Sequence, residues 1–232
     1  MSIDLDFRRF TGRRNLEYLG LEYSLLDSYP SLEAFTKDYS DFFEEIKQEW
    51  ESNKQNVEEF LEALMRTPVS GKARIIIFPR GAGQGHSPQK DVICWGVDAK
   101  GKCKNYYTIY LAHEYLHVFF RREGVENNGY SSDKKRFKED VSHTVNGFIT
   151  DDELRMHLNG EGEYFERWEN RKRKGYHDYL LEFQKSLEPE WREYLESRQK
   201  ALNLIRELRR RQSVKKKWKR KMWPYRKWIL EK

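Results

Sequence analysis

YYTIYLAHEYLHVFFRR, residues 106–122, is the stretch with the strongest helix signal in the chain. Its apolar side chains recur at spacings of three and four residues and therefore share one helical face: Ile109, Ala112, Leu116 and Phe120. Gly124 follows two residues after the stretch, where a glycine commonly ends a helix. We predict an amphipathic helix over residues 106–122, and the candidate chemistry of the protein lies on it.

The helix contains the motif His113-Glu114-Tyr115-Leu116-His117, which is H-E-x-x-H. Histidines four residues apart project from the same face of a helix and can share one tetrahedral metal ion. Glu114 follows the first histidine, where its carboxylate can take a proton from a water whose pKa zinc lowers to about 7. The motif predicts a Zn²⁺ site with His113 and His117 as ligands and Glu114 as the catalytic base.

A catalytic zinc usually has three protein ligands and one open position. The longer pattern H-E-x-x-H-x-x-G-x-x-H is absent, because Phe120 stands where it requires glycine. We therefore expect the third ligand from the following helix, predicted over residues 133–158. His143, in the middle of that helix, is the first choice, and Glu139, one turn earlier, comes next. The helix also offers Asp140, Asp151 and Asp152, and Glu161, just beyond it, is a further alternative.

The rest of the chain reads as helices with a few strands. Residues 31–65 have helical periodicity, with Ser31 as a capping residue and a second helix from about Val57. Two short apolar runs, residues 72–79 and 92–97, read as strands on either side of a Gly-rich loop at residues 80–90. Helices are expected over residues 163–174, 176–187 and 189–211.

This pattern predicts an α+β fold that is predominantly helical, with a small β-sheet. We divide it into an N-terminal helical segment at residues 1–70 and a catalytic core at residues 71–160. Residues 161–232 then form a C-terminal helical extension with a basic, tryptophan-rich tail.

Composition excludes several classes of protein. The 232 residues are 35% charged, but the 15% of aromatic residues can build a core, so a disordered chain is not expected. No run approaches the roughly 18 apolar residues of a transmembrane segment. The first ten residues, MSIDLDFRRF, lack the apolar stretch of a signal peptide. The two cysteines, Cys94 and Cys103, cannot build a disulfide framework. We therefore expect a cytoplasmic protein.

The positive charge is concentrated at the C-terminal end. Residues 206–232 contain thirteen Lys and Arg but two Glu, a surplus of eleven positive charges in a chain whose net charge is +6. Tryptophans are interleaved with these cations at Trp218, Trp223 and Trp228. Three interpretations stay open: a tail packed on the acidic body, a nucleic-acid contact, or a contact with an anionic membrane surface.

The H-E-x-x-H helix resembles the active-site helix of zincin metallopeptidases. Residues 74–154 are similar to small bacterial proteins predicted to be zinc-dependent proteases, in which F-P, a Gly-containing segment and G-V precede H-E-Y-x-H. The matching positions here are Phe78-Pro79, Gly81–Gly85 and Gly96-Val97. The family has a Glu-Gly pair on the next helix, with the Glu as third ligand; the chain has Asn146-Gly147 there.

The resemblance implies a gluzincin-type core that hydrolyses peptide bonds of a peptide or protein substrate. The strand at residues 92–97 would then be the edge strand that pairs with an extended substrate. A second oxyanion donor is also expected, and nothing in the sequence selects among Tyr106, Tyr107, Tyr130 and His157. The alternative is an inactive zincin-like scaffold that binds nucleic acid or protein through its basic tail.

Overall fold

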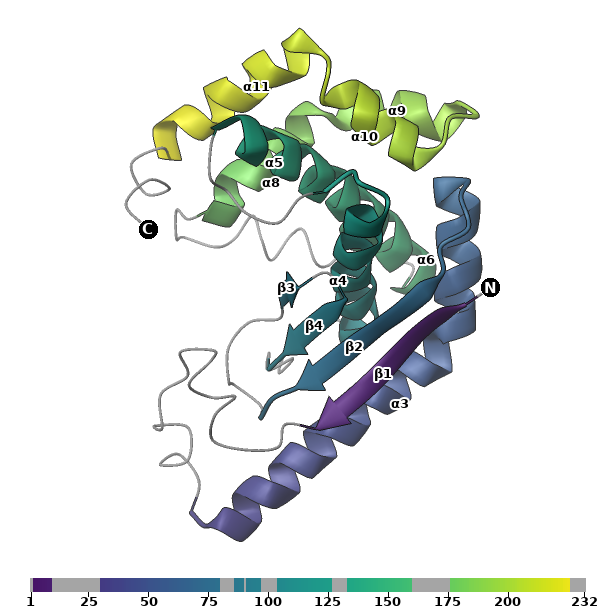
Figure 1. Ribbon diagram of the computed structural model, residues 1–232, viewed down its shortest axis with the longest axis vertical. Coiled ribbons are helices and arrows are strands. Elements are labelled where there is room, and N and C mark those ends of the chain that lie inside the picture. Colours follow the sequence, from purple (N-terminus) through teal and green to yellow (C-terminus); the bar gives the residue numbers. More distant parts are fainter. Residues whose placement is uncertain are drawn as a thin grey trace.

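The computed structural model describes residues 2–9, 30–79, 86–89, 91–96, 104–126, 133–159 and 176–225. Four strands and several helices form an α+β fold that is mostly helical (Figure 1). The elements are, in chain order, β1 (Ile3–Arg9), α3 (Leu32–Met65), β2 (Gly71–Ile77), β3 (His86–Gln89), β4 (Val92–Trp95), α4 (Tyr106–Arg122), α5 (Asp133–Gly147), the π-helix η1 (Phe148–Leu154), α6 (Arg155–Asn159), α8 (Tyr176–Ser186), α9 (Glu188–Glu196), α10 (Ala201–Leu208), α11 (Gln212–Met222) and the 3₁₀ turn η2 (Trp223–Tyr225).

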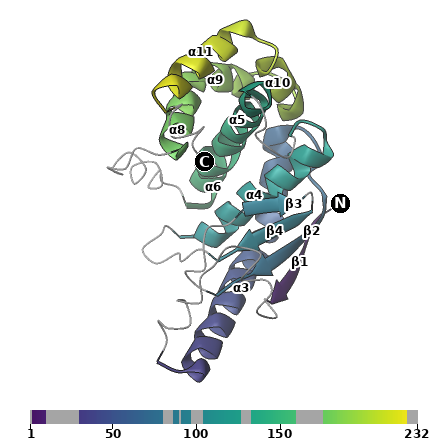
Figure 2. The ribbon, with the colours of Figure 1, turned by 60° about the vertical axis from the view of Figure 1, so that its left-hand side comes forward.

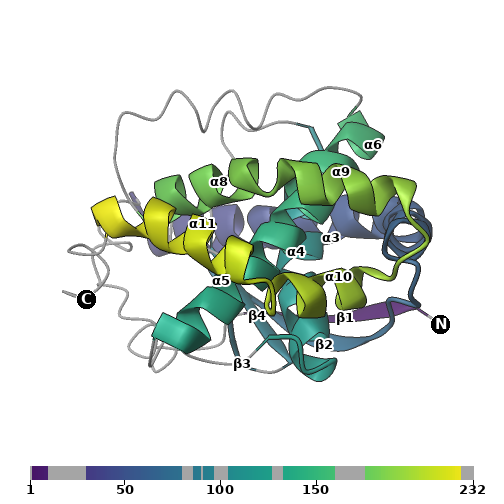
Figure 3. The same cartoon turned by 90° about the horizontal axis from the view of Figure 1, so that it is seen from above.

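The sheet has the strand order β1-β2-β4-β3. The first three strands are parallel, with Ile3 opposite Gly71 and Arg74 opposite Val92, and β3 runs antiparallel to β4 at the edge. β2 buries Ala73, Ile75 and Ile77 and exposes Lys72 and Arg74, so one face of the sheet is covered and the other faces solvent. Helices α3 and α4 lie on the covered face (Figure 3).

Two strands lie where the sequence did not predict any. β1 alternates apolar and charged residues, and it joins the sheet by pairing with β2, so the segment at residues 1–70 contributes a strand to the core. β3 lies within the run that we predicted to be a loop at residues 80–90. Gly81–Gly85 themselves lie outside the described residues. The strands at 72–79 and 92–97 are confirmed as β2 and β4.

The predicted helices are largely present, with corrected bounds. Residues 106–122 form α4 as predicted, and Ser31 caps α3 by accepting a hydrogen bond from the Ala34 amide at 3.1 Å. The prediction of a separate helix from Val57 was wrong, because α3 continues unbroken to Met65. The helix expected over 189–211 is two helices, α9 and α10, because residues 197–200 between them are extended.

The C-terminal helices pack over α5, on the opposite side of it from α4 and the sheet (Figures 1 and 2). The most enclosed contact centres on Asp140, which is fully buried. Its Oδ2 atom accepts hydrogen bonds from Tyr179 OH at 2.5 Å and Trp218 Nε1 at 2.7 Å. One buried cluster of apolar residues runs from Ile3 on β1 to Met222 on α11. Within the described ranges, no helix has the length and apolar character needed to cross a membrane.

Candidate metal centre

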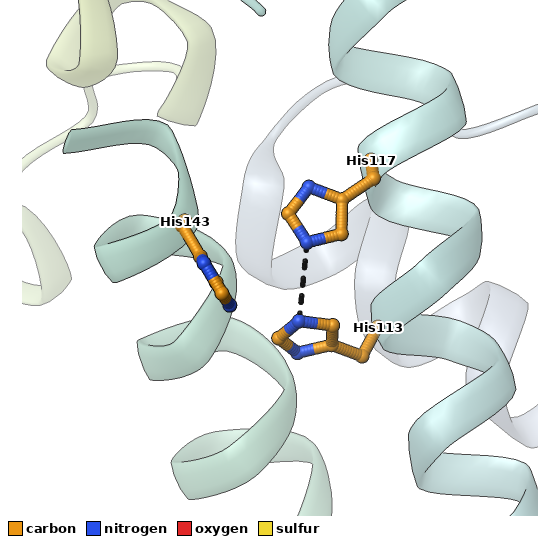
Figure 4. A group of neighbouring side chains, drawn as sticks. All are labelled: His113, His117 and His143. Atoms are coloured by element: carbon orange, nitrogen blue, oxygen red, sulfur yellow. Dashed lines mark hydrogen bonds between the residues drawn. The ribbon is translucent and has the colours of Figure 1, made fainter. Parts of the chain in front are cut away.

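Two helices bring three imidazoles together. His113 and His117 project from α4, and His143 projects from α5 toward them (Figure 4). The ring centroids lie 4.9 to 5.2 Å apart, and one nitrogen of each ring lies within 4.8 Å of the others. The structure therefore joins the two motif histidines to the residue chosen as the first candidate for a third ligand, in a group that could hold a metal ion.

Glu126 fixes the orientation of the His117 ring. Gly124 takes a left-handed conformation with φ of 66°, and the amides of Val125 and Glu126 bond back to the Phe120 carbonyl. This turn reverses the chain and brings Glu126 Oε2 to 2.8 Å from His117 Nδ1. The Nδ1 atom donates to the carboxylate, which holds the other ring nitrogen, Nε2, toward the ring of His113.

The buried Glu126 also changes the electrostatics of the ring. Burial lowers the pKa of His117, but the Glu126 charge and hydrogen bond outweigh burial, so the pKa lies above its usual value. The same carboxylate that favours a proton on this ring favours any cation placed at its Nε2 atom.

Thr150 orients the His113 ring. Its hydroxyl lies 3.0 Å from His113 Nδ1 and 2.8 Å from the carbonyl oxygen of Asn146. Two acceptor oxygens at 2.8 Å require a proton between them, so the Thr150 hydroxyl donates to Asn146 and accepts from His113 Nδ1. This contact turns the Nε2 atom of His113 toward the ring of His117. Thr150 belongs to the π-helix η1, a form that is rare and often found at functional sites.

The two Nε2 nitrogens face each other. His117 Nε2 lies 3.2 Å from His113 Nε2, a hydrogen-bond contact in which one of the two nitrogens donates a proton to the other (Figure 4). A metal ion bound by both rings would take the place of that shared proton. Two nitrogens bound at 2.0–2.1 Å to one tetrahedral zinc are about 3.3 Å apart. Three imidazoles with one open position are a donor set that zinc takes in catalytic sites, so the residues present fit the metal.

Glu114 lies at the same site and is 5% exposed. Burial and the negative charge of Glu114 raise the pKa of Cys94, on β4, to about 11. The Glu114 carboxylate therefore lies on the side of α4 that faces β4, next to a thiol that stays protonated and is a poor metal ligand. Cys94 does not belong to the group of three histidines that could hold a metal ion.

Helix α5 is held against α4 at both ends of the histidine group. Asn146 Nδ2 donates to the His113 carbonyl oxygen at 2.9 Å, and Ser142 Oγ donates to the Val125 carbonyl oxygen at 2.7 Å. His143 lies between these two contacts. Asn146, at the position where the resembled family has its glutamate ligand, thus bonds to the backbone of α4.

The alternative third ligands do not join the group. Glu139 is buried on α5 near Arg209, where burial lowers the Arg209 pKa and the Glu139 charge offsets part of that lowering. Glu139 is outside the histidine cluster. Glu161 lies outside the described residues. The proposed oxyanion donors are no nearer: Tyr106 and Tyr107 are buried against Trp95, and His157 stacks on Phe60 and bonds to Asn56. Tyr130 lies outside the described residues.

The prediction that the strand at residues 92–97 is an edge strand was wrong. β4 cannot offer a free edge along its length, because β2 pairs with one side of it and β3 with the other. β3 is the terminal strand of the sheet, and it contacts α4.

Three side chains near the centre were missed from the sequence: Glu126, Thr150 and Tyr110. The Tyr110 ring lies 6.0 Å from the His113 ring, and Asp151, which the sequence did offer, has its Oδ1 3.5 Å from His113 Nδ1. Tyr110 was predictable, since it is one turn before the motif on the same helix. Glu126 and Thr150 depend on the turn at Gly124 and on the π-helix, which periodicity does not predict.

Comparisons with family models, with curated proteins and with solved structures find no match to the chain.

Proposed function

We propose that the protein is a zinc-dependent metallopeptidase in which His113, His117 and His143 hold the metal. The observation that carries the proposal is the convergence of three imidazoles whose nitrogens lie within 4.8 Å of one another. Two of the rings are oriented through Nδ1, His117 by Glu126 and His113 by Thr150, so their Nε2 atoms face the place that a metal ion would occupy.

Bound by the three imidazoles, a zinc ion supplies Lewis-acid chemistry, lowering the pKa of a water to about 7 and polarising a carbonyl. Glu114 is the base in this proposal: its carboxylate takes the proton from the attacking water and passes it to the nitrogen that leaves. Because Glu114 is 5% exposed, little bulk water competes with the attacking water for its carboxylate.

The substrate would be an extended peptide lying along β3. This strand ends the sheet and contacts the helix that carries the motif. The backbone groups on the outer side of a terminal strand can bond to an added strand without regard to its side chains. A peptide there would run past α4 with its carbonyls near Glu114.

Metal analysis of the purified chain tests the metal. We expect about one zinc per chain, lost in His113→Ala and retained in His157→Ala, a matched control because His157 is an exposed histidine bonded to Asn56. A wild-type chain that holds no zinc, and gains no thermal stability when zinc is added, contradicts the proposal.

Peptide cleavage tests the reaction separately. A mixed peptide library incubated with the zinc-loaded chain should show new termini by mass spectrometry, and Glu114→Gln should keep the zinc but abolish cleavage. Cleavage that persists in Glu114→Gln would contradict the assigned base, and a zinc-loaded chain that cleaves nothing would favour the non-catalytic scaffold.

A further inference from the structure

Helix α11 carries more positive charge than the body neutralises. Its eleven residues, QSVKKKWKRKM, include six Lys or Arg and no acid. Two of the six pair with acids of neighbouring helices: Lys217 Nζ with Glu190 at 2.7 Å and Lys221 Nζ with Glu182 at 3.2 Å. Within the described part of the chain, the other four make no ion pair: Lys215, Lys216, Lys219 and Arg220.

The apolar and charged residues of α11 are on opposite sides. Val214, Trp218 and Met222 are buried against the body, and Trp218 bonds to Asp140. Lys216, Lys219, Arg220 and Trp223 are exposed, and their spacings of three, four and seven residues place them on the opposite face. We call these four residues the basic face. Trp223 is 67% exposed, which is unusual for so large an apolar side chain.

The packing of Trp218 separates the three interpretations of the tail. The first interpretation, a tail packed on the body of the protein, holds for the inner side of α11, which packs on α8. A helix that binds a membrane lays its apolar side into the bilayer, and here that side is occupied by the protein itself. Like charges three and four residues apart repel one another along a helix, so the basic face costs stability that a polyanionic partner would relieve.

We propose that the basic face binds single-stranded nucleic acid. The cations would neutralise successive phosphates with release of counterions, and the exposed indole of Trp223 would stack on an unpaired base. The bases of a duplex are already stacked and cannot stack on Trp223. A single strand can contact the cations with its phosphates and Trp223 with a base. This surface lies on α11, whereas the histidines lie on α4 and α5, so the proposal stands apart from the peptidase.

The test is fluorescence anisotropy of the full chain with labelled oligothymidylate. With the three cations of the basic face engaged, log Kd should change with log salt at a slope of about 2.1, or roughly 20-fold weaker binding for a fourfold rise in salt. A triple variant, Lys216→Ala with Lys219→Ala and Arg220→Ala, should lose most of this binding and reduce the slope by about 2. Trp223→Ala should weaken binding about tenfold, and Trp223→Phe should restore part of it.

The matched control removes three exposed cations elsewhere, Lys37→Ala with Lys47→Ala and Arg198→Ala, and should bind as the unaltered chain does. Circular dichroism establishes that both triple variants remain folded. The proposal is overturned by absence of binding, by an equal loss in both triple variants, or by equal affinity for polyglutamate. Tighter binding to vesicles containing phosphatidylserine than to the oligonucleotide would also overturn it, in favour of a membrane contact.

Discussion

The carboxylate of Glu126 offers the sharpest perturbation of the centre, because it touches the metal site through one atom. Its Oε2 accepts from His117 Nδ1 at 2.8 Å, in a position where its side chain is only 8% exposed. Glu126→Gln keeps the size and shape of the side chain and removes the charge. The amide can also turn its NH₂ group toward Nδ1, which would favour the tautomer protonated at Nε2 and block the metal-binding nitrogen.

The magnitude follows from this contact. Loss of a partner that orients a metal-binding histidine typically costs 10–100-fold in metal affinity, which is about 1.4–2.7 kcal/mol. Glu126 also lies 3.4 Å from Arg121 Nη1, so its neutralisation removes a buried ion pair and lowers the stability of the metal-free chain. Zinc affinity must therefore be measured directly, and a melting temperature does not suffice.

The assay is a competition titration of zinc against a chromophoric chelator, for the unaltered chain, Glu126→Gln and Glu123→Gln. Glu123 is an exposed acid three residues away with no hydrogen bond to the histidines, so its substitution controls for the local change in charge. We expect 10–100-fold weaker zinc binding for Glu126→Gln and less than threefold for Glu123→Gln. Equal affinities for all three proteins would refute the assignment of Nε2 of His117 as a ligand oriented through Glu126.

Three further predictions concern the surroundings of the centre. Thr150→Val removes the acceptor for His113 Nδ1 without changing side-chain shape, so zinc affinity should fall about tenfold in the same titration; unchanged affinity would contradict the proton assignment. Asp140→Ala removes the buried acceptor that Tyr179 OH and Trp218 Nε1 share and should lower the free energy of unfolding by about 1–3 kcal/mol in urea, whereas a loss below about 0.5 kcal/mol would show that the site relaxes. Burial and the nearby Asp151 raise the pKa of Asp152 to about 8 from 3.8. The protonated carboxyl therefore makes its full contribution to the free energy of unfolding below about pH 4, and this contribution is lost as the pH rises through about 8. Asp152→Asn should therefore gain stability relative to the unaltered chain between pH 5 and pH 9, and a constant difference in urea midpoint would contradict this.

The part of the fold that the sequence predicts is the part with strong local periodicity. α4 was predicted to the residue because apolar side chains repeat along it at helical spacing and Gly124 follows it, although the structure buries the helix on nearly every side and not on one face. β1 was missed because a short strand that alternates Asp and Arg with apolar residues resembles a polar terminus until β2 supplies its partner. The prediction divided the single long helix α3 into two. The second half of α3 has polar residues at its solvent-exposed positions, and these weakened the apolar periodicity.

The candidate metal centre likewise has a part that the sequence predicts and a part that it does not. His113, Glu114 and His117 follow from one local motif, and His143 follows from its position within the next predicted helix. Glu126 and Thr150 could not be selected, because each reaches its histidine through backbone that departs from regular helix. Tertiary packing decides the positive φ at Gly124 and the wider turn of the π-helix. The spacing of apolar residues along the sequence does not predict that packing.

Asn146 explains how a third histidine can stand in for the glutamate of the resembled family. The side chain at position 146 faces the backbone of His113, at a distance of 2.9 Å from its carbonyl oxygen, and it supplies a donor that a carboxylate lacks. A glutamate there would place a negative charge against a carbonyl oxygen in a fully buried position, at a cost of several kcal/mol. One turn earlier, His143 lies opposite the gap between the two rings of α4. The chain therefore uses position 146 to hold the helices together, and it places the imidazole of position 143 beside the other two, where the proposed metal would bind.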